Sequence, residues 1–285
     1  MKIDFVRFEA SDGVELQGWM NHEAGDTAAV HIHGMSGNGY ENYFLDNLRK
    51  MYEQKGITFF TIDTRGRGIA SDFKQGNGTK HGGSCFEIFD ESIYDIQGAI
   101  DYLKGLGKTK FILQGHSLGG SKVVNYVVSK NNPEIIASVL LAPTDMTGWA
   151  NTDSSHHKYL QKAKQLMAAG KNEELVGVKC WKDKTPISAQ TYPTICEEGS
   201  SADIYSERKG GVILGKLQIP TIIAYGTEDI GILDVDGSVE KFVDRVSKIK
   251  NQNTAIQLIK DATHSYAEHE DELAASVGDF VSSLT

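Results

Sequence analysis

The alternation of apolar and polar residues along the chain predicts two kinds of β-strand. Residues 3–9 and 14–20 alternate between apolar and polar side chains on either side of Ser11-Asp12-Gly13, which is typical of a half-exposed antiparallel hairpin. Segments such as 57–63 and 219–225 are nearly continuous apolar runs, as expected where helices cover both faces of a sheet. The segments with strand character are 3–9, 14–20, 28–32, 57–63, 110–114, 136–142, 219–225 and 254–260.

Between these strands, apolar residues recur at the spacing of one helix face. One such face comprises Phe44, Leu45, Leu48, Met51 and Tyr52, and another comprises Phe89, Ile93, Ile96, Ile100 and Leu103. Further helical patterns follow Ser117, follow the seventh strand and close the chain. Because strands and helices alternate, we expect right-handed crossovers between parallel strands. The pattern therefore predicts an α/β protein in which helices flank an eight-stranded, mostly parallel sheet.

One region interrupts this alternation after the sixth strand. From 145 to 209 we expect no strand, but a helical stretch over 157–169 that Gly170 ends, followed by irregular polar sequence. A segment inserted at this point lies over the carboxyl ends of the parallel strands, where open α/β sheets bind ligands. We interpret it as a small cap. The expected organisation is a core of residues 1–144 and 211–285 with a cap insertion of residues 145–210.

Charge and hydropathy narrow the partners and the location. The formal net charge is −9, and no local cluster of Lys and Arg offsets it, so we expect neither a nucleic acid nor a membrane surface as partner. No window approaches the ~20 apolar residues of a membrane-spanning helix, and the charged start of the chain lacks the apolar stretch of a secretory signal. We therefore expect a cytoplasmic protein, with Cys85, Cys180 and Cys196 as free, reduced thiols. The sequence leaves the oligomeric state open.

A Gly-x-Ser-x-Gly turn is the first feature with chemical meaning. The predicted strand at 110–114 leads directly into Gly115-His116-Ser117-Leu118-Gly119 and then into a helical pattern. This is the setting that a nucleophile elbow requires, because the glycines permit a tight turn that exposes the serine hydroxyl at a helix N-terminus. We therefore predict that Ser117 is a catalytic nucleophile. The alternative is a structural glycine-rich turn.

A serine nucleophile needs a base to remove its proton and an acid to orient that base. Asp229 follows the seventh strand and His264 follows the eighth, so both are expected at the same edge of the sheet as Ser117, in the chain order Ser, Asp, His. We predict that His264 is the base and Asp229 the acid. Asp229 is alternatively a turn or helix-capping residue. The other candidate carboxylates are Glu228, Asp234, Asp236 and Asp145, and we expect His116 to be a packing residue and His269 to lie on or near the final helix.

Acyl transfer also needs backbone N–H groups that stabilise an oxyanion. One donor is the residue after the nucleophile, and the other lies in the loop after the third strand, here His33-Gly34-Met35. Leu118 and Met35 occupy these positions, so we predict that their N–H groups form the oxyanion hole. The alternative is that the loop is a glycine-rich turn without a ligand.

Together, these motifs resemble the α/β-hydrolase superfamily over nearly the whole chain. The residues that carry the resemblance are His33-Gly34, Asp63-Thr64-Arg65-Gly66-Arg67-Gly68, Gly115 to Gly119, Gly226 to Asp229 and His264. Within the superfamily the chain is similar to esterase-like hydrolases with a short helical insertion, including feruloyl or cinnamoyl esterases. A similarity to fungal siderophore esterases rests on residues 87–91 and 188–192. The resemblance implies the hydrolase fold, the triad and the oxyanion donors at the positions named.

These expectations define a reaction. Ser117 attacks the carbonyl of a small-molecule carboxylic ester while His264 takes its proton, and water then releases the acid from the acyl-enzyme. This reaction needs no cofactor, and no cluster of histidines and cysteines indicates a metal site. The same triad serves a thioesterase, lactonase, peptidase or carbon–carbon hydrolase. A protein that binds a ligand without turnover is an alternative of a different class.

Aromatic residues of the predicted cap are candidates for the substrate pocket, because pockets are mostly apolar. These residues are Trp149, Tyr159, Trp181 and Tyr192. The alternative is that they only pack the cap against the core.

Overall fold

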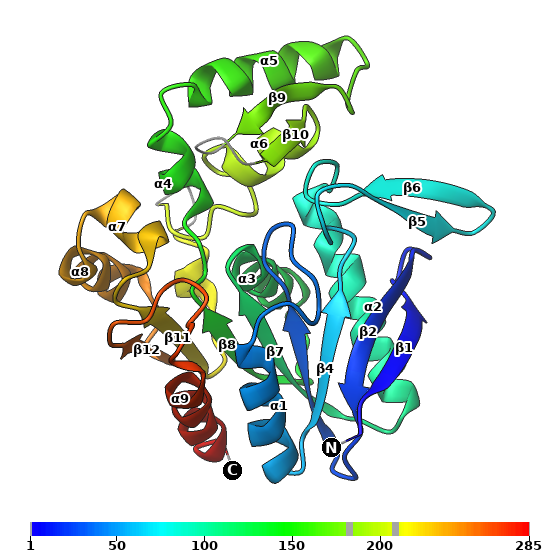
Figure 1. Cartoon of the computed structure of the whole chain (residues 1–285), viewed down its shortest axis with the longest axis vertical. Helices are drawn as coiled ribbons and strands as arrows, with labels where there is room; N and C mark the ends of the chain where they lie inside the picture. Colours follow the sequence, from blue (N-terminus) through cyan, green and yellow to red (C-terminus); the bar gives the residue numbers. More distant parts are fainter. Residues whose placement is uncertain (1, 181–184, 207–210, 285) are drawn as a thin grey trace.

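A computed structural model describes residues 2–180, 185–206 and 211–284, and its central feature is an eight-stranded sheet (Figure 1). The second strand pairs in antiparallel fashion with both of its neighbours, and the remaining neighbouring pairs are parallel. The predicted α/β class and the mostly parallel sheet are therefore confirmed. In order across the sheet, the strands are β1 (Asp4–Glu9), β2 (Glu15–Asn21), β4 (Thr58–Asp63), β3 (Thr27–Ile32), β7 (Lys110–His116), β8 (Ile135–Leu141), β11 (Thr221–Gly226) and β12 (Thr254–Ile259).

Helices cover both faces of this sheet, as Figure 1 shows. The helix α1 (Phe44–Gln54) packs beside α9 (Glu270–Ser282), and α2 (Ser92–Gly105) packs beside α3 (Leu118–Lys130). The apolar face predicted for the first helix is buried against the sheet. Because both faces are covered, all residues of β4 and β11 are buried, which explains their continuous apolar sequence.

Residues 146–180 and 185–196, here called the cap segment, form a layer beyond the carboxyl ends of the parallel strands (Figure 1). The helix predicted over 157–169 is confirmed, but the expectation of no strand in this region is wrong, because two short strands pair as an antiparallel hairpin. The hairpin has an irregular register and a glycine within its first strand, so it lacks the alternation that marks strands in a sequence. The elements of the cap segment are α4 (Met146–Asn151), α5 (His156–Ala168), β9 (Leu175–Cys180), β10 (Thr185–Ser188) and α6 (Thr191–Cys196).

The cap segment has an apolar cluster of its own, separate from the main core. Residues from α4, α5, α6 and the hairpin contribute to it. Three further buried members come from outside the cap segment: Phe89, Ala202, and Leu118 at the start of α3. The cap segment is therefore packed directly on the residue that follows Ser117.

A second unpredicted hairpin consists of β5 (Ser71–Gln75) and β6 (Gly78–Gly82). Most of its side chains are polar and at least partly exposed, and Phe73 is the buried apolar residue of β5. Alternation of apolar and polar residues therefore gave no signal here. Gly76 adopts a φ of +56° at the turn, which glycine permits without strain.

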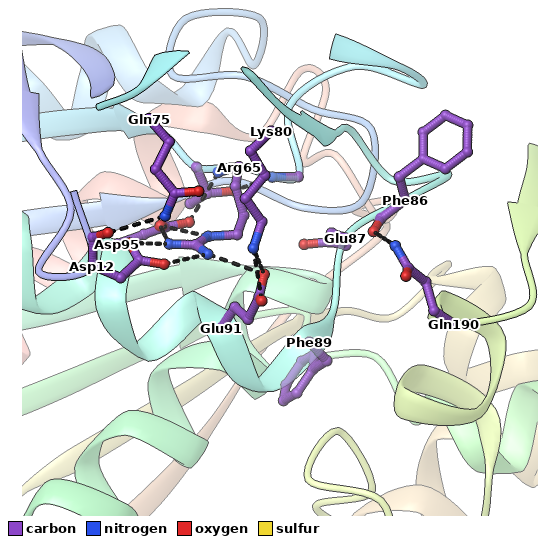
Figure 2. A network of polar contacts seen from close by, with 12 residues as sticks. Asp12, Arg65, Gln75, Lys80, Phe86, Glu87, Phe89, Glu91, Asp95 and Gln190 are labelled. Atoms are coloured by element: carbon purple, nitrogen blue, oxygen red, sulfur yellow. Dashed lines mark hydrogen bonds and ion pairs between the residues drawn. The ribbon is translucent and has the colours of Figure 1, made fainter. Parts of the chain in front are cut away.

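A buried ionic network holds the loop after β4 against α2, as Figure 2 shows. The guanidinium group of Arg65, which is 1% exposed, donates to Asp12, Glu91 and Asp95 at 2.8 to 3.0 Å. Lys80 from the β5–β6 hairpin pairs with Glu91 at 2.6 Å. Because breaking one partner of a buried ion pair leaves an uncompensated charge, this network ties the loop firmly to the core.

The segment 85–91 connects this network to the cap segment (Figure 2). On the core side, Glu87 pairs with Lys122 of α3 at 2.5 Å, and both side chains are buried. On the cap side, the carbonyl of Phe86 accepts from Gln190 Nε2 at 2.9 Å, and the carbonyl of Cys85 accepts from the backbone N–H of residue 188 at 2.9 Å. The cap segment is thus hydrogen-bonded to a segment that the core holds in place.

Candidate active site

The Gly-x-Ser-x-Gly turn adopts a strained backbone between β7 and α3. Ser117 has a φ of +54° and a ψ of −126°, an unusual conformation for a residue other than glycine. A Cβ atom on Gly115 would lie 2.3 Å from the carbonyl oxygen of Gly119, and a Cβ on Gly119 would lie 2.2 Å from the carbonyl oxygen of Ile32. The two glycines therefore permit the close approach of the turn to β3 and fix Ser117 at the start of α3.

The residues predicted as acid and base lie side by side. His264 Nδ1 lies 2.9 Å from Asp229 Oδ2, although the two residues come from the loops after different strands. Asp229 is 1% exposed, and its other oxygen, Oδ1, accepts from the backbone N–H of Gly231 at 2.8 Å as the N-cap of α7 (Ile230–Asp236). Both carboxylate oxygens are thus used, which fixes the orientation of the carboxylate toward the imidazole.

His116 holds the backbone of His264 in place. His116 Nε2 donates to the carbonyl oxygen of His264 at 2.9 Å, and the two rings are 4.9 Å apart. Burial lowers the pKa of His116 to about 3, so its ring is neutral at neutral pH and contributes no competing positive charge beside His264. The sequence predicted that His116 is a packing residue, but it did not indicate this hydrogen bond.

Ser117 and His264 line one cavity of about 280 Å³ beneath the cap segment. In this structure Ser117 Oγ lies 3.0 Å from Thr144 Oγ1, and within the described ranges no hydrogen bond joins Oγ to the His264 ring. Catalytic hydrogen bonds of this kind are often long before substrate binds. The residues that line the cavity are Met35, Ser36, Ser117, Thr144, Met146, Trp149, Thr185, Ile230, Gly231 and His264.

The other carboxylates considered for the acid make different contacts. Asp145 caps α4 by accepting from Gly148 and pairs with Arg245 at 3.0 Å, and Asp236 binds the same arginine at 2.7 Å. Asp234 accepts from Trp149 Nε1 at 3.2 Å. Glu228 is exposed, and His269 lies at the N-cap of α9, where it pairs with Glu272 at 3.5 Å.

The two predicted oxyanion donors lie at the start of α3 and in the loop after β3. Leu118 is the first residue of α3, so its N–H has no acceptor within the helix. Met35 follows β3 and lines the cavity. The next residue, Ser36, has a φ of +57°, and its Oγ lies 2.5 Å from the buried hydroxyl of Ser84. This hydroxyl pair fixes the conformation of the loop that carries Met35.

His33 provides a second anchor for the same loop. Its Nε2 accepts from the backbone N–H of Thr64 at 3.0 Å, and its Nδ1 lies 2.7 Å from the carbonyl oxygen of Gly34. Burial lowers the pKa of His33 to about 4, so the ring is neutral and Nδ1 carries the proton that it donates to this carbonyl.

The four aromatic residues proposed for the pocket do not share one location. Trp149 lines the cavity. Tyr159 and Tyr192 pack edge to face at 5.7 Å within the cap segment, and the hydroxyl of Tyr192 lies 3.0 Å from His156 Nδ1. Neither tyrosine is among the described residues that line the cavity, and Trp181 lies outside the described residues.

Sequence reasoning missed Thr144, Ser36 and Ser84. Thr144 follows the sixth strand of the main sheet, and the rule that places functional residues at carboxyl strand ends could have identified it. Ser84 is far in the sequence from Ser36, the residue that it contacts, so no local pattern pointed to it.

Across residues 2–180, 185–206 and 211–284, no group of three His, Cys, Asp or Glu side chains is arranged to hold a metal ion. None of the described helices combines the length and apolar character needed to cross a bilayer.

A protein-family model matches most of the chain. A family model described as "Protein of unknown function (DUF1749)" matches residues 81–283, a span that contains Ser117, Asp229, His264 and the cap segment. The match begins after the loop that carries Met35. No curated protein matches the chain in sequence.

Solved structures share the fold over nearly the whole chain. One is Est1E from Butyrivibrio proteoclasticus with ferulic acid bound, which is 17% identical with a TM-score of 0.67 over 98% of this chain and 99% of that chain. Another is the α/β hydrolase GrgF from Penicillium sp. sh18, which is 16% identical with a TM-score of 0.70 over 98% of each chain. A third is the Pyrococcus furiosus esterase Pf2001, which is 18% identical with a TM-score of 0.61 over 99% of this chain and 90% of that chain. The α/β-hydrolase fold that the sequence predicted is therefore confirmed.

Proposed function

Since the chain belongs to the DUF1749 family and has the α/β-hydrolase fold, we propose that it is a serine hydrolase that cleaves a small carboxylic ester. The observation that supports this most strongly is the 2.9 Å contact between His264 Nδ1 and Asp229 Oδ2 beside a cavity that Ser117 and His264 both line. These three residues follow three separate strands of the sheet. If the glycine-rich turn at Ser117 had only a structural role, it would not require an aspartate–histidine pair at the same cavity.

In the proposed reaction, Asp229 determines which nitrogen of His264 carries the proton. A carboxylate only accepts hydrogen bonds, so it holds the proton on Nδ1 and leaves Nε2 free to take the proton from Ser117 Oγ. The deprotonated Oγ attacks the ester carbonyl, and the N–H groups of Met35 and Leu118 stabilise the oxyanion. The imidazolium then protonates the departing alcohol. Water activated by the same histidine releases the acid and restores Ser117.

The cavity favours a small, uncharged acyl group. Its volume of about 280 Å³ is just below the range of roughly 300–1,000 Å³ that is typical of small-molecule sites. Met35, Met146, Trp149 and Ile230 provide apolar surface. Among the described residues that line it, His264 is the titratable side chain, and none is a carboxylate, lysine or arginine. Among the described lining residues, a charged acyl group would find no opposite charge to compensate for the hydration that it loses.

A substrate panel tests this proposal. The panel contains p-nitrophenyl acetate, butyrate and hemisuccinate, together with a butyryl thioester, a lactone and an aminoacyl anilide. We expect the highest kcat/KM for the neutral short-chain esters and a much lower value for the hemisuccinate. Faster turnover of the thioester, lactone or anilide would assign the triad to another reaction. Absence of turnover combined with absence of fluorophosphonate labelling would indicate a ligand-binding protein.

A further inference from the structure

Thr144 lies at the carboxyl end of β8, beside the proposed nucleophile. The residue is 6% exposed, and its Oγ1 lies 3.0 Å from Ser117 Oγ. Thr144 also lines the cavity, so this contact lies where the ester carbonyl must approach.

The turn that carries Thr144 is held rigidly on its N-terminal side. Ala142 has a φ of +44°, a strained conformation for a residue with a Cβ atom. The next carbonyl, that of Pro143, accepts from the hydroxyl groups of both Tyr205 and Tyr225, and both of these side chains are buried. These contacts hold the strained turn in one conformation, and they therefore fix the position of the Thr144 backbone.

The turn is also held on its C-terminal side. The carboxylate of Asp145 accepts from the backbone N–H of Gly148 at 2.8 Å through one oxygen and from Arg245 Nη1 at 3.0 Å through the other. Arg245 is itself bound by Asp236. The backbone around Thr144 is therefore anchored to α4 on one side and to α8 (Val239–Ile249) on the other.

The direction of the hydrogen bond between the two hydroxyl groups follows from the triad. A carboxylate only accepts, so His264 Nδ1 donates to Asp229, and in the neutral imidazole Nε2 then carries no proton and can only accept. For Ser117 to give its proton to Nε2, its own O–H must point at His264. Ser117 Oγ is then an acceptor toward Thr144, and the Thr144 hydroxyl is the donor.

We propose that Thr144 is a further catalytic residue whose hydroxyl donates to Ser117 Oγ and stabilises the negative charge that builds up on this oxygen. This inference rests on the proposed serine hydrolase function. In acylation, the bond from Oγ to the acyl carbon forms while the Oγ proton moves to His264 Nε2, and the bond to the alcohol oxygen breaks as Nε2 passes this proton to the alcohol. In deacylation, water attacks the acyl carbon and gives a proton to Nε2, and the bond from Oγ to the acyl carbon breaks as Nε2 passes that proton to Oγ. Thr144 keeps its own proton in both steps, and its hydrogen bond is strongest when Oγ carries charge.

Two substitutions separate the hydroxyl from the shape of the side chain. Thr144→Val replaces the hydroxyl by a methyl group of similar size, and Thr144→Ser keeps the hydroxyl and removes the methyl group. With p-nitrophenyl butyrate, we expect T144V to lower kcat by about ten- to a hundredfold with little change in KM, because a hydrogen bond to a charged oxygen is lost. We expect T144S to stay within about threefold of the wild type.

Fluorophosphonate labelling provides the second readout, because it follows attack by Ser117 without the later deacylation step. T144V is expected to label more slowly than T144S, and thermal unfolding of each variant checks that the fold is retained. If T144V does not fold, Thr144→Ala removes the same hydroxyl without adding an atom.

The outcomes distinguish this inference from the proposed function. If T144V matches the wild type or exceeds it, or if T144S loses as much activity as T144V, the catalytic role of the hydroxyl is refuted while the triad stands. If Ser117→Ala retains activity and labelling in the same assays, the proposed function itself fails.

Discussion

The carboxyl edge of the sheet and the cap segment border the same cavity, but they are built differently. At the sheet edge, Asp229 uses both of its carboxylate oxygens, and His116 holds the backbone of His264. The cap segment instead has its own apolar cluster and contributes side chains such as Met146 and Trp149 to the cavity wall. The proposed reacting groups thus follow strands of the sheet, whereas the cap segment supplies only one part of the cavity wall, which includes Met146 and Trp149.

Leu118 belongs to both regions. Its N–H is the proposed oxyanion donor, and its side chain is buried in the apolar cluster of the cap segment. The sheet edge and the cap segment therefore have different proposed roles, but they pack against each other through Leu118. This difference predicts large losses of turnover from changes at the sheet edge and smaller, substrate-dependent effects from changes in the cap segment.

The largest expected effect comes from removing the nucleophile. Ser117→Ala should lower kcat on the order of a millionfold, because the remaining groups cannot form the acyl-enzyme. Its thermal unfolding should match that of the wild type, since no packing is lost. Esterase assays at high enzyme concentration together with calorimetry check both statements. Retention of most activity would show that the chemistry does not depend on this edge of the sheet.

The second prediction compares two aspartates that follow neighbouring strands. Asp229→Asn should lower kcat by up to about ten-thousandfold, because the amide no longer holds the proton on His264 Nδ1. Asp145→Asn should lower kcat by less than about tenfold, because it removes an ion pair with Arg245 while asparagine still caps α4. The same ester assay measures both variants. A greater loss from the Asp145 change would mean that Asp229 is not the acid.

The third prediction concerns the pH dependence of stability at the sheet edge. Burial lowers the pKa of His116 to about 3 and that of His33 to about 4, whereas both titrate near 6.5 in the unfolded chain. As the pH falls below about 6.5, the unfolded state therefore takes up protons that the folded state does not. Between this pH and its folded-state pKa, each histidine should lower the free energy of unfolding by about 1.4 kcal/mol for each pH unit of acidification. Above about pH 6.5 neither histidine lowers the free energy of unfolding.

Urea unfolding at several pH values measures this slope. His116→Asn should reduce the slope by about 1.4 kcal/mol per pH unit relative to the wild type. An unchanged slope would mean that His116 is protonated in the folded protein.

The smallest expected effect comes from the cap segment. Trp149→Ala should lower kcat/KM by about tenfold for p-nitrophenyl butyrate and less for the acetate, because the longer acyl chain loses more apolar contact. Met167→Ala is a matched control, since Met167 lies on α5, is 41% exposed and does not line the cavity. Equal losses for both esters would indicate that Trp149 supports the fold instead of contacting the acyl group.

The sequence predicted the sheet edge better than the cap segment for a physical reason. Buried parallel strands require continuous apolar runs, and the elbow requires Gly115 and Gly119 at fixed spacing from Ser117, so each leaves a local pattern. The hairpins β5–β6 and β9–β10 were not predicted, because exposure or an irregular register removes the alternation of apolar and polar residues.

Contacts between distant residues left no such pattern. The pairing of Ser36 with Ser84, and that of Thr144 with Ser117, join segments 48 and 27 residues apart. Arg245 approaches Asp145 across a separation of 100 residues. Each of these contacts depends on how the strands are ordered in the sheet, which local composition does not record. The same limit applied to the pocket, where Tyr159 and Tyr192 proved to pack within the cap segment.

The most direct test of the account is the site and rate of covalent labelling. The protein is incubated with a fluorophosphonate, and peptide mass spectrometry locates the adduct in the wild type and in His264→Ala. We predict one adduct per chain, on Ser117, and a rate of formation at least about a thousandfold lower in the His264 variant. An adduct on another residue, or equal labelling rates in the two proteins, would contradict the claim that His264 activates Ser117.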